Sequence, residues 1–200
     1  MIGMIFTTPE EARRFVAAYG DGRFDALDEG VPQHDDSVLA MATGIGKIKA
    51  TLQTERLLRA HDLDRLIHVG TCTGLSDEAE VGRLFGASFV VEGDRVALSA
   101  AAYPRMPLEA PDACDLSGTM VTQDHAVEGD EERQYWQRIG DVTDTTAYAV
   151  AYVAGQHGTS CTVVKAITAQ AGEERDSFQE DRRDGYAQIA DFALQALNAA

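Results

Sequence analysis

Residues 66–75, LIHVGTCTGL, carry the residue types best suited to ligand chemistry. Gly70 and Gly74 lack a Cβ and so permit tight turns and close backbone approach. Thr71 and Thr73 offer hydroxyls, and the N–H groups of such a loop can bind an anion or an ordered water. An apolar run that ends in this loop predicts a buried strand delivering a binding turn, although an ordinary strand-to-loop junction gives the same pattern.

Glu11 is a carboxylate in a well-defined local setting. It lies three residues after Thr8, and Pro9 follows Thr8, which is the pattern of a helix N-cap with a capping box. The helix that follows has an apolar face formed by Ala12, Phe15, Val16 and Tyr19. A structural role as the capping acid is therefore sufficient to explain Glu11 by itself.

The remaining elements alternate between strands and helices. Strands are predicted over residues 2–6, 37–42, 81–91, 116–124 and 160–167, helices over residues 47–61, 131–139 and 178–198, and a small hairpin over residues 23–27. This alternation predicts one α/β domain spanning residues 1–200, a three-layer sandwich with a mainly parallel, twisted central sheet.

Composition limits the partners and the setting. The net charge of −16 argues against nucleic acid as a partner, because phosphate backbones need basic surfaces. Thirty-three acidic residues stand against 17 Lys and Arg, which also suits a protein from concentrated salt, as in a halophile. No apolar run is long enough to span a bilayer, and no signal peptide is visible. Three scattered cysteines show no zinc or disulfide spacing, so a reducing cytoplasm is expected, with no metal.

Two motifs follow in order on one expected βαβ unit: Gly44-Ile45-Gly46-Lys47 and Gly70-Thr71-Cys72-Thr73-Gly74. With them the chain resembles the nucleoside phosphorylase and nucleosidase superfamily. The resemblance implies the phosphorylase/nucleosidase fold, a homodimer or larger assembly, a small nucleoside-like ligand and no cofactor. It also implies cleavage of an N-glycosidic bond through an oxocarbenium-like transition state.

The same resemblance assigns roles to particular residues. Glu11 matches the acid that activates the attacking water in the nucleosidases, at about the place where the phosphorylases hold phosphate with an arginine. An acid there repels phosphate and favours hydrolysis. Gly44, Gly70 and Thr71 belong to the two binding loops. Thr119, in Ser117-Gly118-Thr119, lies on the strand expected beside the purine.

Two positions depart from the family pattern. The family's Asp-Met-Glu, whose glutamate holds the sugar hydroxyls, becomes Asp144-Thr145-Thr146, so that Thr146 retains at most one hydroxyl contact. Asp144 is more simply a helix cap. The aspartate that protonates the leaving base becomes Ala169; loss of a general acid typically removes about 10²- to 10⁴-fold of rate.

Nearby side chains offer partial replacements for the missing acid. Gln170 can donate a hydrogen bond to a base but supplies no proton, and Glu173 and Glu174 are acids in the same segment. Cys72, inside the binding loop, would need a partner base to act as a nucleophile, and none is visible nearby in sequence.

The sequence therefore predicts hydrolysis of the N-glycosidic bond of a purine nucleoside or a related ribosyl compound. Two alternatives stay open. One is a catalytically impaired homologue that binds a nucleoside as a sensor or subunit partner. The other is a phosphate-dependent nucleoside phosphorylase, in which Thr71 would replace the phosphate-binding serine and His68 would stand where that enzyme class has arginine.

Overall fold

The structure is a computed structural model that describes residues 1–94, 103–173 and 176–198. Glu174 lies outside these residues. The elements follow one another as β1 (Ile2–Phe6), α1 (Pro9–Ala18), the 3-10 turn η1 (Tyr19–Asp21), β2 (Gln33–His34), β3 (Val38–Ala42), α2 (Lys47–Ala60), β4 (Arg65–Gly74), β5 (Leu84–Glu92), β6 (Arg105–Pro107), β7 (Leu116–Thr122), α3 (Gly129–Gln137), β8 (Val142–Asp144), α4 (Ala147–Gln156), β9 (Ser160–Gln170) and α5 (Phe178–Asn198).

The strands form one mixed sheet with a closed part. β3, β1, β4 and β9 are parallel neighbours, as are β5, β7 and β8. Antiparallel pairings join β4 to β8 and β5 to β9, so that β4, β9, β5, β7 and β8 close a ring. The prediction of a mainly parallel central sheet is therefore wrong, because the sheet is mixed, although the α/β class holds.

The length and curvature of β4 and β9 explain the closure. They pair in parallel over their whole lengths, with a register shift between Cys72 and Thr73 that bends the pair. The bend lets the amino-terminal part of β4 pair with β1, while its carboxyl-terminal end reaches β8. An apolar strand carries no mark of its partner's direction, so sequence periodicity did not reveal this arrangement.

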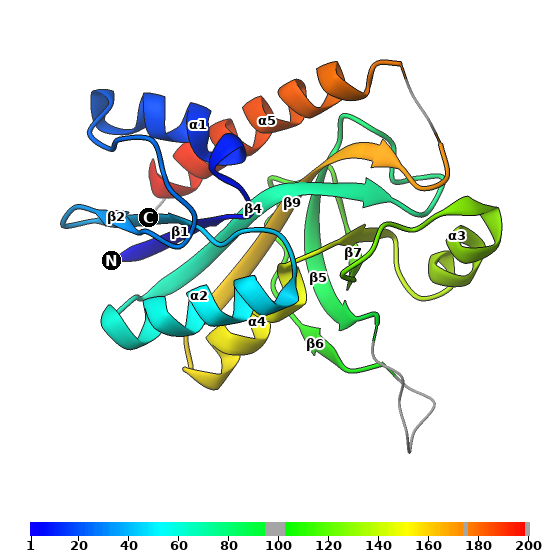
Figure 1. Ribbon diagram of the computed structural model, residues 1–200, viewed down its shortest axis with the longest axis horizontal. Helices are drawn as coiled ribbons and strands as arrows, with labels where there is room; N and C mark the ends of the chain where they lie inside the picture. Colours follow the sequence, from blue (N-terminus) through cyan, green and yellow to red (C-terminus); the bar gives the residue numbers. More distant parts are fainter. Residues whose placement is uncertain (95–102, 174–175, 199–200) are drawn as a thin grey trace.

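Helices cover the sheet on two sides. Figure 1 shows α1 and α5 together above the strands, and α2 with α4 below them. The ring of Phe15, on α1, packs against that of Phe6, on β1, with 5.3 Å between the ring centroids, in a core cluster that also contains residues of α5. The long strands β4 and β9 run through the middle, with their carboxyl ends on the same side of the molecule.

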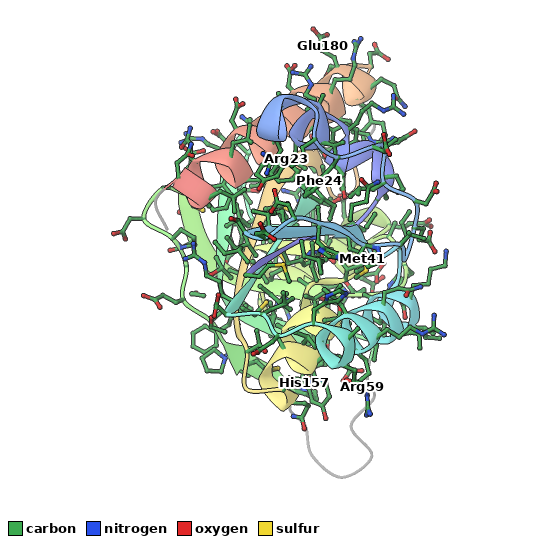
Figure 2. All side chains as sticks on the ribbon, turned by 90° about the vertical axis from the view of Figure 1, so that its left-hand side faces the viewer. Arg23, Phe24, Met41, Arg59, His157 and Glu180 are labelled. Carbon is green, nitrogen blue, oxygen red and sulfur yellow. The ribbon has the colours of Figure 1, made fainter. Side chains whose placement is uncertain are left out.

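The far ends of α2 and α4 are joined by polar contacts. His157 Nε2 lies 2.6 Å from Glu55 Oε2, and Arg59 Nε donates to the other oxygen of Glu55 at 2.5 Å. Figure 2 shows Arg59 and His157 close together at this end, whereas Glu180 lies at the opposite extreme, on α5.

Most predicted elements agree with the structure to within a few residues. The bounds of α5 coincide with the prediction, and the capping box of α1 is present. The hairpin predicted over residues 23–27 is wrong, because that segment is turn and coil and the short β2 pairs with β3 instead. Within the described ranges, no helix is both long enough and apolar enough to cross a membrane.

Candidate active site

A cavity of about 470 Å³ opens where the carboxyl ends of β4, β8 and β9 meet the first turns of α1 and α5. The side chains on its walls include many threonines. The lining residues include Thr7, Glu11, Thr71, His125, Asp144, Ala169, Gln170, Glu173, Phe178, Arg182 and Tyr186. Strand ends are the usual place for ligand sites in α/β sheets.

Glu11 joins the first turn of α1 to Thr71 of β4. The loop predicted over residues 70–74 is wrong, because these residues continue β4 and pair with β9. Its Oε2 accepts from the Thr8 N–H at 2.9 Å, which is half of the capping box. Its Oε1 accepts from the Thr71 N–H at 3.0 Å and from the Thr71 hydroxyl at 2.9 Å. The capping role and a place in the site are thus compatible, because they use different oxygens of one carboxylate.

Gly70 allows this close packing. A Cβ on Gly70 would lie 2.8 Å from Thr7 Oγ1, 2.9 Å from Lys165 Nζ and 3.2 Å from Glu11 Oε2. These separations are below normal van der Waals contact, so a larger residue would displace the acid or the lysine. Gly70 therefore brings Glu11 and Lys165 to the same small region of the cavity floor.

Beneath that floor, Lys165 and Asp144 form a buried ion pair. Lys165 Nζ lies 3.3 Å from Asp144 Oδ2, and neither side chain is more than 1% exposed. Nζ also donates to Thr7 Oγ1 at 3.1 Å and lies 2.9 Å from His68 Nε2. The ammonium thus has partners for its three donors, as burial of a charge requires.

His68 is a neutral, fully buried member of this cluster. Burial and the adjacent Lys165 hold the pKa of His68 well below its usual value. Its Nδ1 lies 3.1 Å from the Ile5 carbonyl oxygen, which can only accept, so Nδ1 carries the proton. Nε2 is therefore an acceptor for Lys165. This arrangement agrees with the interpretation of His68 as a buried, hydrogen-bonded histidine.

Thr146 lies in the cluster rather than on the cavity wall. Its hydroxyl is 2.9 Å from His68 Nε2, 3.3 Å from Lys165 Nζ and 3.2 Å from Asp144 Oδ2, and the residue is fully buried. Asp144 also accepts from the N–H groups of Thr146 and Ala147 at the start of α4. The N-cap residue of α4 is Thr146, so the prediction of Asp144 as the N-cap is wrong by two positions, although its carboxylate binds the first N–H groups of the helix.

The opposite wall carries the position of the missing acid. Ala169 and Gln170 line the cavity at the end of β9, with Glu173 beyond them. The Gln170 amide donates to the Ser76 carbonyl at 2.9 Å, and its buried Oε1 has no hydrogen-bond partner. As oriented, this amide is held toward Ser76.

The structure distributes the predicted site residues unevenly. Glu11, Thr71 and Gln170 line the cavity. Gly70 and Thr146 lie directly behind its wall. Gly44 and Thr119 are not among the lining residues: Gly44 donates its N–H to the Thr7 carbonyl, and the Thr119 N–H donates to Asp141.

Cys72 lines the cavity but is poorly suited to nucleophilic chemistry. Burial, together with the nearby charge of Asp144, raises the pKa of its thiol well above the usual value. A thiol that stays protonated is a weak nucleophile. Among the described residues, no cluster of three or more His, Cys, Asp or Glu side chains is placed to hold a metal ion.

Sequence reasoning missed two charged groups on the cavity wall, His125 and Arg182. His125 lies between two carboxylates, with Nδ1 at 3.1 Å from Asp94 and Nε2 at 2.6 Å from Glu132. The hydrogen bond with Glu132 is the main cause of the raised pKa of His125. The two carboxylates that contact His125 are 31 and 7 residues away in sequence, so no local sequence pattern indicated the contacts.

The protein thus belongs to the α/β class, with a cavity at the carboxyl ends of its strands. The family model described as the phosphorylase superfamily matches residues 31–199, and the chain belongs to that family. No match is found among curated protein sequences.

Solved structures share the fold at low sequence identity. A futalosine hydrolase mutant of Helicobacter pylori has a TM-score of 0.84 at 19% identity, covering 99% of this chain and 98% of that one. The 5'-methylthioadenosine/S-adenosylhomocysteine nucleosidase of Neisseria meningitidis, in complex with methylthio-immucillin-A, gives 0.83 at 18% identity, with 100% and 99% covered. The Helicobacter pylori nucleosidase of that name, with butyl-thio-DADMe-Immucillin-A, gives 0.81 at 18% identity, with 99% and 97% covered.

Proposed function

We propose that this protein hydrolyses the N-glycosidic bond of a nucleoside-like compound, with a purine nucleoside or a related ribosyl compound as substrate. Membership of the phosphorylase superfamily and the nucleosidase names of the similar structures support this class of reaction. The observation that carries the choice of hydrolysis is the position of Glu11 against Gly70 and Thr71 of β4.

The position of Glu11 favours water over phosphate as the nucleophile. The Thr71 N–H and hydroxyl are the donors that an anion bound at this part of β4 would use, and both donate to the Glu11 carboxylate. An inorganic phosphate would lose those donors and meet a like charge. A carboxylate oxygen can accept two hydrogen bonds, and Oε2 has one from Thr8, so it can accept a further one from water.

In the proposed mechanism, Glu11 orients and deprotonates a water that attacks the sugar carbon as the bond to the base breaks. The threonine hydroxyls around the cavity hold the sugar, since Thr146 is committed to the buried cluster. The base leaves toward Ala169 and Gln170 as an anion and takes its proton from solvent, because neither residue carries an acid; the proton that Glu11 accepts from the attacking water is then released to solvent. Because position 169 carries no carboxylic acid, we expect turnover to be about 10²- to 10⁴-fold slower than with a positioned general acid.

A binding protein without catalysis is the second candidate. It is favoured by the same replacements, because Thr146 is turned into the buried cluster and Ala169 has no ionisable group.

The test is product analysis. Purified protein is incubated with methylthioadenosine, adenosine, inosine and futalosine, with and without phosphate, and the free base is measured. Base release without phosphate supports hydrolysis, and release only with phosphate contradicts it. Binding without release supports the second candidate.

A matched pair of variants tests the role of Glu11. Glu11→Gln keeps one acceptor oxygen, which can hold the capping contact with Thr8 or the contact with Thr71 but not both, and it removes the base; the rate should fall by about 10²- to 10⁴-fold. Glu10→Gln, on the exposed side of the same turn, should leave cleavage unchanged. An intact rate in Glu11→Gln would show that the assigned role is wrong.

A further inference from the structure

One face of α5 presents a cation between two aromatic rings to the cavity. Phe178, Arg182 and Tyr186 all line it, at the four-residue spacing that aligns side chains along a helix. Arg182 Cζ lies 5.6 Å from the ring centroid of Phe178 and 5.6 Å from that of Tyr186. An Arg182 Nη2 donor reaches the Tyr186 hydroxyl at 2.5 Å. Figure 2 shows Glu180 at this outer end of α5.

The charge of the cavity makes Arg182 distinctive. Glu11 and Glu173 contribute carboxylates to the walls, and among the described lining residues Arg182 is the single Arg or Lys. Lys165, the buried cation, lies beneath the floor and is fully paired there. A negatively charged part of a ligand would therefore find its favourable contact at Arg182.

Arg182 is also incompletely paired. Among the described residues, the carboxylate oxygen within ion-pair distance of Arg182 is Glu10 Oε2, 3.9 Å from Nη2, which is too long for a hydrogen bond. The Glu10 side chain is 64% exposed and Arg182 is 33% exposed, so the ion pair is weak and easily exchanged. A guanidinium has five N–H donors in a planar fork, which fits a carboxylate or a phosphate with two parallel hydrogen bonds.

We propose that Arg182 determines specificity by selecting a nucleoside-like ligand that carries an anionic oxygen group, a carboxylate or a phosphate ester, on a sugar substituent. This inference rests on the proposed function. The anionic group pairs with the guanidinium, and an apolar linker lies against the Phe178 ring, which is 40% exposed. Arg182 is close to Glu10, beside the acid assigned to the sugar carbon, which places this contact on the sugar side of the site.

A purely structural role for Arg182 makes a different prediction. If Arg182 only holds α5 against α1 through Glu10, its loss lowers thermal stability but leaves the relative affinities of neutral and anionic ligands unchanged. The ratio of two affinities in one protein therefore separates recognition from stability.

The experiment measures binding by calorimetry at about 0.1 M salt, where a Debye length of about 10 Å leaves charge contacts effective. The ligands are adenosine 5'-thioethers with a butyl or a 3-carboxypropyl chain, adenosine 5'-phosphate, and inorganic phosphate alone. The proteins are the wild type, Arg182→Met, Arg182→Lys, and Arg183→Met as a matched control on the exposed face of α5.

The carboxypropyl compound should bind the wild type at least about tenfold more tightly than the butyl compound, the scale of a charge-assisted hydrogen bond. Arg182→Met should remove that preference, Arg182→Lys should retain part of it, and Arg183→Met should keep it whole. Preference for adenosine 5'-phosphate instead would identify a phosphate ester as the anionic group.

Equal affinities in the wild type, or a preference that survives Arg182→Met, would overturn the inference. So would inorganic phosphate that binds as tightly as either anionic ligand, because the site would then hold a free anion. If the preference is found but no compound is cleaved, the proposed hydrolysis fails and the recognition role stands. If neutral compounds are cleaved and the wild type shows no preference for anionic ligands, the proposed hydrolysis stands and the recognition role of Arg182 fails.

Discussion

Lys165 Nζ lies 3.3 Å from Asp144 Oδ2, in a pair of side chains that are almost wholly buried. Lys165 is on β9 and Asp144 ends β8, and both strands belong to the closed ring of the sheet. The pair thus links the floor of the cavity to the start of α4, where Asp144 accepts from the Ala147 N–H.

Removing one partner of this pair should be strongly destabilising. Lys165→Met would leave Asp144 charged and buried without its cation, at an expected cost of about 3–5 kcal/mol in the free energy of unfolding. Urea unfolding measures it. The double variant Lys165→Met/Asp144→Asn should recover part of the loss, because no unpaired charge remains. An unchanged midpoint in the single variant would contradict the buried pair.

Gly70→Ala should disturb the site as well as the fold. The added Cβ would lie 2.8 Å from Thr7 Oγ1 and 2.9 Å from Lys165 Nζ, so these groups must shift. We expect a loss of about 1–3 kcal/mol, the usual range for overpacking. Gly82→Ala is a control for glycine replacement in open space, although its positive φ adds local strain. A Gly70→Ala protein with wild-type stability and ligand affinity would show that the close packing is unimportant.

His125 should make stability fall as pH rises above about 6.5. Its pKa is raised in the folded state, chiefly by the hydrogen bond with Glu132 and with help from Asp94. Its contribution is therefore complete below the unfolded value of about 6.5 and is lost as pH rises through the folded value. Because the side chain is 52% exposed, the effect should be small.

Melting temperatures at pH 6 and pH 8 provide the measurement. The decrease from pH 6 to pH 8 should be smaller in His125→Gln than in the wild type, whereas His34→Gln, changed on the exposed strand β2, should behave like the wild type. The same slope in all three proteins would rule out this role.

Ala169→Asp should accelerate cleavage if hydrolysis is limited by protonation of the leaving base. Ala169 lines the cavity, so a carboxylic acid there can reach the ligand. A positioned general acid contributes about 10²- to 10⁴-fold, and a gain of at least tenfold in kcat is a cautious expectation. Ala169→Asn, of similar size but without an exchangeable acid, is the control. Equal rates in the two variants would count against a protonation-limited step.

High salt should stabilise this acidic chain if it is adapted to such conditions. With a net charge of −16, self-repulsion weakens as the Debye length falls from about 30 Å at 0.01 M to about 3 Å at 1 M. We expect the melting temperature to rise between dilute buffer and molar potassium chloride. Sulfate is avoided because it strengthens apolar burial in any protein. A flat profile would contradict the halophilic hypothesis.

Local features of the chain were predictable because their causes are local. The capping box joins residues three apart, and the long closing helix follows from apolar residues at helical spacing. The contact of Glu11 with Thr71 was predictable only through resemblance, because 60 residues separate them.

Tertiary structure alone decided how β9 is used and what surrounds Thr146. β9 pairs in parallel with β4 and antiparallel with β5, and an apolar run encodes neither choice. The hydroxyl of Thr146 meets His68 and Lys165, which lie 78 and 19 residues away. Hydrophobic periodicity tells which side of an element is buried, whereas the partners across the core depend on strand order and register. The polar floor of the site, with its paired lysine and neutral histidine, therefore emerges only when the sheet closes.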